Sequence, residues 1–384
     1  MCLANKIQCL HISSICSWFR HQIKIVVMHR CASYITTMGR YITITEIAKQ
    51  LNLSHSTVSR ALSSHARISE KTRALVQNLA DELGYQANST AHHLSKGESQ
   101  IIAVIVPQLS VHFFSKVVEG IQKVLKETDY SLLLFSTNES LEEEIQAIQT
   151  CLKHRVDGVL VAISRETKTF DHFKQLLKHE VPIVFFDRVA NFLPVPKVIT
   201  NDYQASFDAT DHLLKTGCKY IAHITGSINL NNSNNRLYGY LDALASHEIK
   251  MRESLVHYFE FELSSIDKFL IKTLKKHPKL DGLFVFNDYA AHYAVNVLNK
   301  MGKRVPDDIS VIGFSDEPVA TYMSPKLSTV QQVASKMGEL TAQKIISILN
   351  KNEPMVSEKI IINPELILRE TTKNVPISTD SDQA

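Results

Sequence analysis

The sequence contains no long hydrophobic run, and none of its apolar stretches approaches the ~20 residues that a membrane-spanning helix needs. Glycine and proline are sparse, with 12 and 11 among 384 residues, which excludes collagen-like and low-complexity disordered chains. A composition of 44% hydrophobic and 21% charged residues is that of an ordinary globular protein. We therefore expect two or three domains, no export and no membrane partner.

Cysteine is also scarce, and four of the six cysteines lie within the first 40 residues. The main body keeps only Cys151 and Cys218, too few for a disulfide framework, which indicates a reducing, cytoplasmic location. No Cys-x2-Cys or Cys/His pair has the spacing of zinc ligands. We expect no bound metal.

Local catalytic motifs are missing as well. The sequence has no H-E-x-x-H and no G-x-S-x-G, and the first apolar strand, Ile101 to Val106, runs into Pro107-Gln-Leu-Ser instead of a glycine-rich phosphate loop. These absences predict that the chain is not an enzyme and has no cofactor.

Residues 1–40 contain five basic and no acidic residues, whereas the rest of the chain is slightly acidic. The net charge of +3 therefore says little about nucleic acid. We expect these residues to be an N-terminal extension upstream of the true start, with translation beginning at Met38 or Met28.

The first well-organised signals describe two short capped helices. Thr43 and Glu46 have the spacing of a capping box before a helix that ends near Leu51. Asn52, which tolerates a left-handed conformation, makes the turn, and Ser54 caps a second helix over 55–62. A third helix opens at Ser69 and stops at Gly84, so residues 41–84 predict a three-helix domain.

The exposed face of the second helix consists of His55, Ser56, Ser59 and Arg60. Short polar side chains and arginine are the groups that bind base edges in the major groove of DNA. From Ile101 onwards, apolar runs of strand length alternate with amphipathic helical stretches, which predicts parallel sheets covered on both faces.

The string Ile44-x-Glu-Ile-Ala-x-x-Leu-x-Leu-Ser-x-Ser-Thr-Val-Ser-Arg-Ala-Leu62 resembles the head of the lactose-repressor (LacI/GalR) family, and the resemblance runs from about residue 42 to 372. It implies an all-α helix-turn-helix head plus an α/β two-lobed, periplasmic-binding-protein-like (type I) effector domain. His55, Ser56 and Arg60 would contact bases, with Ser54, Thr57 and Ser59 nearer to phosphates. A purely structural role stays open for Thr57 and Ser59.

Residues 85–98 would be a hinge that contacts DNA through Asn88, Ala91 and Leu94. The family's matching leucine wedges into the minor groove. This chain departs from many relatives at Ala87, where they carry proline, and at His92, where they carry a basic residue. His92 and His93 suggest that operator binding strengthens at mildly acidic pH.

The resemblance further divides residues 99–372 into lobe one, at 99–200 and 306–330, and lobe two, at 201–305 and 331–372, joined by three crossovers. Residues 373–384 would be a polar tail. A ligand in the cleft would contact side chains at or beyond the carboxyl ends of strands. The candidates, which match effector positions of the family, are Phe113, Phe114, Asp187, Arg188, Arg236, Asn287 and Asp288.

These side chains suit a sugar or sugar derivative, because carboxylates and arginine bind hydroxyls while an aromatic ring covers the sugar. The alternative for Asp187 and Arg188 is a mutual structural salt bridge. We expect a homodimer, or a tetramer, that binds double-stranded operator DNA as a repressor under effector control. The alternatives are an activator of the same family and a sugar-binding protein without a regulatory role.

Overall fold

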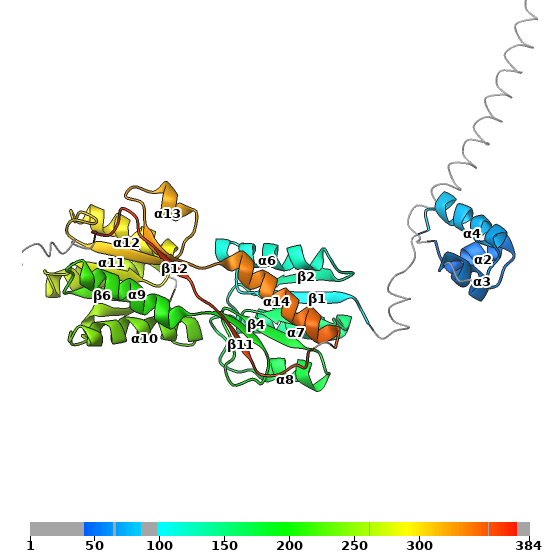
Figure 1. Ribbon diagram of the computed structural model, residues 1–384, viewed down its shortest axis with the longest axis horizontal. Helices are drawn as coiled ribbons and strands as arrows, with labels where there is room; N and C mark the ends of the chain where they lie inside the picture. Colours follow the sequence, from blue (N-terminus) through cyan, green and yellow to red (C-terminus); the bar gives the residue numbers. More distant parts are fainter. Residues whose placement is uncertain (1–41, 64–66, 86–97, 261, 352, 375–384) are drawn as a thin grey trace, which may run out of the picture. The chain divides into compact units, whose positions relative to one another are not determined.

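The computed structural model describes residues 42–63, 67–85, 98–260, 262–351 and 353–374, which form a small helical unit and a larger α/β unit (Figure 1). Each unit is described by itself below. Several predictions lie outside the described residues: the extension with Met28 and Met38, the linker positions Ala87, Asn88, Ala91, His92, His93 and Leu94, and the tail from residue 375 onwards.

The helical unit consists of α2 (Ile44–Leu51), α3 (His55–Leu62) and α4 (Glu70–Glu82). The predicted capping box is present: Glu46 N donates to Thr43 Oγ1 at 3.3 Å, and Thr43 N donates to the Glu46 carboxylate at 2.7 Å. Asn52 has φ 52°, as the left-handed turn requires. Ile47, Val58 and other buried side chains from all three helices form the core of this unit.

Two six-stranded sheets build the α/β unit. The strands are β1 (Ile101–Val106), β2 (Ser131–Ser136), β3 (Gly158–Val161), β4 (Ile183–Phe186), β5 (Lys197–Thr200), β6 (Ile221–Thr225), β7 (Val256–Tyr258), β8 (Gly282–Val285), β9 (Ser310–Ser315), β10 (Ser328–Gln331), β11 (Lys359–Ile362) and β12 (Glu365–Ile367). The sheet of lobe one has the order β11-β5-β4-β3-β1-β2, and that of lobe two β12-β10-β9-β8-β6-β7. Neighbouring strands run parallel except β10 and β12.

Helices cover both faces of each sheet, which explains why the strands are apolar throughout rather than alternating. The helices are α6 (His112–Leu125), α7 (Leu141–His154), α8 (Asp171–Lys178), α9 (Asp202–Lys215), α10 (Asn231–Ser246), η1 (Glu253–Leu255), α11 (Leu263–Lys276), α12 (Asp288–Lys300), α13 (Val319–Tyr322) and α14 (Ala334–Leu349). In lobe one, α7 and α8 bury one face of the sheet, and α6 and α14 the other. In lobe two, α11 and α12 bury one face, and α9 and α10 the other.

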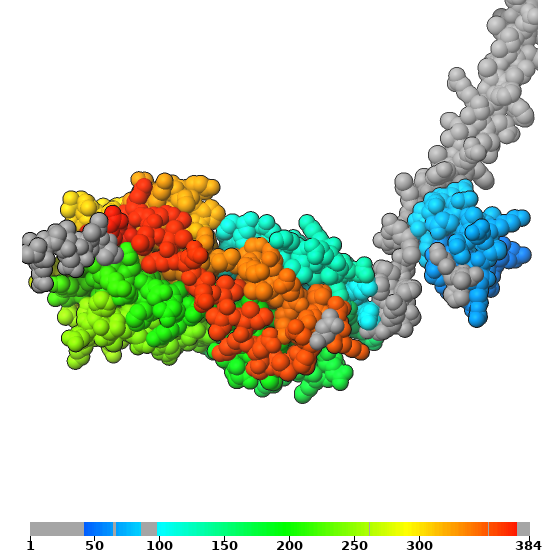
Figure 2. Space-filling view, in the orientation of Figure 1, coloured from blue at the N-terminus to red at the C-terminus, as the bar shows by residue number. Residues whose placement is uncertain are grey.

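The predicted division between the lobes is wrong at one crossing. No crossing occurs at 305–306: β9 and β10, which were assigned to lobe one, pair within the second sheet. The third crossing lies instead between β11 and β12, so α14 and β11 belong to lobe one, where β11 pairs with β5. Figure 1 shows α14 beside α6, and Figure 2 shows the last segment, in red, running over both lobes. Apolar runs locate strands, but they do not say which sheet a strand joins.

Two glycines let α6 and α14 cross closely. A Cβ atom on Gly120 would lie 2.1 Å from the carbonyl oxygen of Ser335, and one on Gly338 would lie 2.0 Å from that of Val117. Backbone oxygens cannot move away as a flexible side chain would, so any larger residue must separate the helices. Among the described residues, no helix is long and apolar enough to cross a membrane.

Candidate DNA-binding surface and ligand cleft

The outward face of α3 is the candidate DNA-binding surface. Ser54 caps the helix, because its Oγ accepts from Thr57 N at 3.1 Å. Val58 and Ala61 point into the core, which leaves His55, Ser56 and Arg60 exposed. The structure thus places the three predicted base-contacting residues on one accessible face.

Thr57 and Ser59 are only partly exposed. The hydroxyl of Thr57 lies 2.7 Å from Ser54 Oγ, which also contacts Ser56 Oγ at 3.0 Å. The interpretation of Thr57 as a structural residue gains support from this hydroxyl pair. A phosphate contact at Ser59 stays a prediction.

The charge around this face suits a polyanion only modestly. The described residues of the helical unit include five basic and four acidic side chains. The first turn of α3 contains no acidic residue, so no carboxylate of that turn opposes its exposed amides. The net charge of the unit alone therefore offers little attraction for DNA.

The predicted cleft residues Asp187 and Arg188 follow β4 and are both buried. The mutual salt bridge that we considered is present but long, with Arg188 Nε and Asp187 Oδ2 3.9 Å apart. Arg188 Nη1 also donates to both carboxylate oxygens of Glu139, at 2.9 and 2.7 Å. Asp187 receives a long hydrogen bond of 3.4 Å from Asn232, and burial raises the pKa of its carboxyl group. Its φ of 54° puts it in the left-handed region, as is common at functional sites.

Arg236, on α10, is buried in lobe two and has several partners there. Its Nε and Nη2 both lie 2.8 Å from Asp202 Oδ1, and Nη1 donates to the carbonyl of Phe286 at 2.5 Å. The guanidinium carbon lies 3.6 Å from the ring centroid of Phe314. Burial raises the pKa of Asp202, although Arg236 opposes that rise. Arg236 is thus held rigidly, with one face covered by an aromatic ring.

Asn287 and Asp288 lie at the start of α12, and both have hydrogen-bond partners within the protein. Asn287 caps the helix by accepting from Ala290 N at 2.8 Å. Asp288 accepts from Thr329 Oγ1 at 2.5 Å and from Glu317 N at 2.8 Å. Burial raises the pKa of Asp288 to about 7. Ligand contact by these two residues stays a prediction, and Asp288 clearly fixes the loop after β9.

Phe113 and Phe114 begin α6 and are 6% and 2% exposed. Their rings meet edge to face at 5.3 Å, and both belong to the core of lobe one. The Phe114 ring centroid lies 5.4 Å from the guanidinium carbon of Arg188. The structure therefore places Phe114 next to Arg188, one of the predicted polar residues.

Hydrogen bonds join the lobes across the cleft. Val189 N donates to Asn231 Oδ1 at 2.8 Å, and Asn231 Nδ2 lies 3.4 Å from the carbonyl of Asp187. Where the chain passes between the lobes after β5 and β10, Gln332 Nε2 donates to Thr200 Oγ1 at 3.3 Å. The first turn of α10 in lobe two is thus tied to the loop after β4 in lobe one.

Sequence reasoning missed several of these residues. Glu139 follows β2 directly and could have been found by the same strand-end rule that selected Asp187. Asn231 and Asn232 lie in the asparagine-rich segment just before Arg236, in which no other site residue was predicted. No local pattern could have paired Asp202 with Arg236, because 34 residues separate them.

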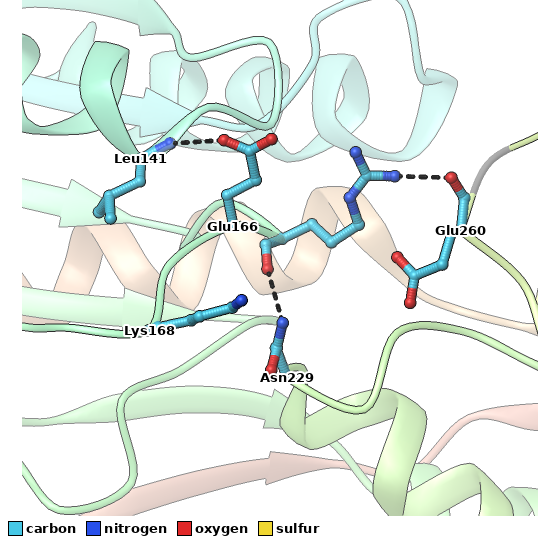
Figure 3. Close-up of a pocket in the computed structure, with 6 residues that line it drawn as sticks. Leu141, Glu166, Lys168, Asn229 and Glu260 are labelled. Carbon is cyan, nitrogen blue, oxygen red and sulfur yellow. Dashed lines mark hydrogen bonds between the residues drawn. The ribbon is translucent and has the colours of Figure 1, made fainter.

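A cavity of ≈ 510 Å³ opens at the mouth of the cleft (Figure 3). Its lining comes from both lobes: Leu141, Arg165, Glu166, Lys168, Asn229 and Glu260. Arg165 Nη1 donates to the carbonyl of Glu260 at 2.9 Å, and Asn229 Nδ2 lies 3.5 Å from the carbonyl of Arg165. Its size is that of a small-ligand site.

Glu139 connects this cavity to the buried residues. One of its carboxylate oxygens accepts from Arg165 N at 2.8 Å and from Arg188 Nη1 at 2.7 Å. Glu139 thus bonds both to a residue that lines the cavity and to Arg188, whereas none of the predicted effector residues lines the cavity itself. Within the described ranges, no group of His, Cys, Asp or Glu is arranged to hold a metal ion.

Comparisons with known proteins agree with this architecture. Residues 43–88 match the family model "Bacterial regulatory proteins, lacI family", and residues 99–370 match "Periplasmic binding proteins and sugar binding domain of LacI family". The chain is 30% identical over 331 residues to the ribose operon repressor of Halalkalibacterium halodurans, covering 86% of this chain and 97% of that protein. It is 29% identical to the regulator DegA of Bacillus subtilis, covering 88% and 99%.

Solved structures give the same result. The complex of the regulator CelR with cellobiose has a TM-score of 0.66 at 26% identity and covers 86% of this chain and 99% of CelR. The lac repressor dimer, bound to operator and an anti-inducer, matches with a TM-score of 0.75 at 22% identity, covering 87% of this chain and 99% of the repressor chain, which supports the fold. The predicted fold class is confirmed. The expectations of a non-enzymatic protein and of a cytoplasmic location follow from the family. The chain belongs to the LacI family of DNA-binding transcription regulators, with a helix-turn-helix head and a periplasmic-binding-protein-like domain.

Proposed function

We propose that this regulator is a repressor that binds a pseudo-palindromic operator as a homodimer and changes its operator affinity when a small polyhydroxylated metabolite occupies the cleft. Two observations carry the proposal: hydrogen bonds of Asn231 and Gln332 join the lobes, and residues of both lobes line one cavity. A ligand held from both sides must favour one lobe arrangement over another, and that preference is what coupling to DNA requires.

Relatives support the partner classes. The curated relative with 30% identity is a ribose operon repressor, CelR was solved with cellobiose, and the lac repressor was solved as a dimer on its operator. For this chain, operator contacts are assigned to Ser54, His55, Ser56, Thr57, Ser59, Arg60, Asn88, Ala91 and Leu94. Effector contacts are assigned to the predicted cleft residues, with Glu139 and Asn232 added to them.

The DNA half of the proposal is tested with duplexes selected from a randomised library by the full-length protein. Arg60→Ala is expected to weaken binding to the selected duplex by about 1–3 kcal/mol per half-site, because a bidentate contact from arginine to guanine is worth that much. Fluorescence anisotropy at fixed salt measures the loss. Lys300→Ala, which removes an exposed charge at the end of α12, is the matched control and should bind like the wild type.

Equal affinity of Arg60→Ala and wild type for the selected duplex would remove Arg60 from the base-contacting set. A selected consensus without two-fold symmetry would contradict the homodimer. A reporter gene downstream of the selected site distinguishes repression from activation: expression that rises when the regulator is deleted supports a repressor.

A further inference from the structure

The buried part of the cleft holds more carboxylates than cations. Its described charged side chains are all at least nine-tenths buried: Glu139, Asp187, Asp202, Asp288, Arg188 and Arg236. Four potential negative charges therefore face two positive ones. An excess of buried charge of one sign determines which ligands can enter, because interactions are strong where water is excluded.

Both arginines are already committed to partners. Arg188 is paired with Glu139 at 2.7 Å, and Arg236 with Asp202 at 2.8 Å. The guanidinium of Arg236 is further occupied by a backbone carbonyl and by the face of Phe314. Neither cation is placed to neutralise an anionic ligand without giving up a buried ion pair, which is strongly unfavourable.

Asp187 has no close ion-pair partner, because its nearest cation, Arg188, is 3.9 Å away. Its hydrogen bonds come from amide side chains, Asn232 Nδ2 at 3.4 Å and Gln332. Asp288 accepts from neutral donors, Thr329 and the Glu317 amide, and the Glu317 carboxylate adds negative charge nearby, whereas Asp316 is paired with Arg369 at 2.7 Å. The uncompensated charge is thus negative on both sides of the cleft.

The mouth cavity does not reverse this balance. Arg165 and Lys168 contribute two positive charges to its lining, and Glu166 and Glu260 contribute two negative ones. Glu166 also accepts from Leu141 N at 3.4 Å, a bond drawn in Figure 3. A ligand entering past this neutral rim would meet a negative interior.

We propose that the cleft selects a polyhydroxylated effector that carries a protonated amine, over its neutral and anionic counterparts, with the carboxylate of Asp187 as the partner of the ammonium group. This inference rests on the proposed effector function of the same cleft. The hydroxyls would bind the amides of Asn231, Asn232 and Gln332, which already bridge or face the lobes. Burial raises the pKa of Asp187, although Arg188 and Arg236 oppose that rise.

The test is calorimetric titration of the full-length protein with two matched sugar series: glucose, glucosamine and glucuronate, and galactose, galactosamine and galacturonate. In the series that binds, the amine should bind at least tenfold more tightly than the neutral sugar, and the uronate most weakly. Asp187→Asn should abolish the preference for the amine. Asp307→Asn, which removes an exposed carboxylate ahead of β9, is the matched control and should keep it.

A neutral sugar or a uronate that binds as tightly as the amine would overturn the inference, as would the absence of binding by all six compounds. The order of affinities in the wild type decides the matter even if Asp187→Asn fails to fold. Binding to the selected duplex, measured on the same preparation, shows separately whether the DNA-binding function stands.

Discussion

At the scale of single residues, the cleft contains buried carboxylates whose ionised forms are unfavourable. Burial raises the pKa values of Asp187, Asp202 and Asp288, which means that the folded protein favours their protonated forms more than water does. Such groups cluster at functional sites, where structural stability is sacrificed for a polar environment. Asp288 shows the cost most clearly, because it is fully buried and the described part of the chain gives it only neutral donors.

Asp288 predicts a specific dependence of stability on pH. Its pKa is about 7 in the folded protein, against ~3.9 for aspartate in an unfolded chain. A raised folded pKa contributes stability that is fully present below the unfolded value and is lost as the pH rises through the folded one. The melting temperature of the α/β unit, followed by calorimetry, should therefore fall between about pH 4 and about pH 7.

Asp288→Asn should make this fall shallower, since Asp288 no longer titrates while Asp202, whose pKa is also raised to about 7, still does. The absolute stability of the variant will differ too, because asparagine cannot accept both hydrogen bonds in the same way. The slope with pH is therefore the informative quantity. Asp307→Asn, at an exposed position, should keep the slope of the wild type, and an unchanged slope in Asp288→Asn would refute the assignment.

At the scale of helices and strands, the sequence predicts most of what is local. The capping box of α2, the left-handed Asn52 and the Ser54 cap involve residues no more than four apart, so they can be recognised directly. The apolar runs predict β1 and six other strands to within a few residues. Strands β5, β7, β10, β11 and β12 escaped prediction, because each has at most three consecutive apolar residues, whereas the equally short β3, β4 and β8 lie in longer apolar runs.

Distance along the sequence also explains which contacts in the cleft could not be predicted. Arg188 was selected at a strand end, but its partner Glu139 lies 49 residues earlier. Only the parallel arrangement of the strands brings their carboxyl ends to one edge. The position of α14 was mispredicted for a similar reason, since its contact with α6 depends on glycines more than 200 residues apart in sequence.

Those glycines make a prediction about the packing of α6 and α14. Gly120→Ala and Gly338→Ala should each lower the free energy of unfolding by about 1–3 kcal/mol, because the added methyl group overlaps a backbone oxygen of the other helix. Chemical denaturation measures the change. Gln343→Ala, on the exposed face of α14, should stay within about 0.5 kcal/mol of the wild type. A cost at Gly120 no larger than at Gln343 would contradict the close crossing.

At the scale of the whole α/β unit, two lobes are joined by three chain crossings and by a few hydrogen bonds between loops. The crossings act as a fixed connection, whereas the loop contacts of Arg165, Asn229 and Asn231 can form or break as the lobes move. Ligand control over the lobe arrangement is possible only because these contacts are few. Each one therefore sets part of the balance between open and closed forms.

Arg165 offers the cleanest measure of that balance. Its guanidinium donates to the carbonyl of Glu260 in the other lobe, so Arg165→Ala should shift the unliganded protein toward the open form by about 0.5–1.5 kcal/mol. The amide of Val189 reports the shift, because it donates across the cleft to Asn231 Oδ1 and is released on opening. Its hydrogen exchange should become about 2- to 10-fold faster in Arg165→Ala, as the same free energy implies.

Lys168→Ala is the matched control for Arg165→Ala, because Lys168 lies three residues further along the same loop and lines the same cavity. For Lys168, the described residues provide no hydrogen bond to the other lobe, so exchange at Val189 should stay at the wild-type rate in this variant. Equal acceleration in both variants would mean that loss of positive charge at the mouth opens the cleft, and no acceleration in either would mean that the Arg165 contact contributes nothing to closure. Faster exchange in Arg165→Ala alone would assign the effect to the interlobe contact of Arg165.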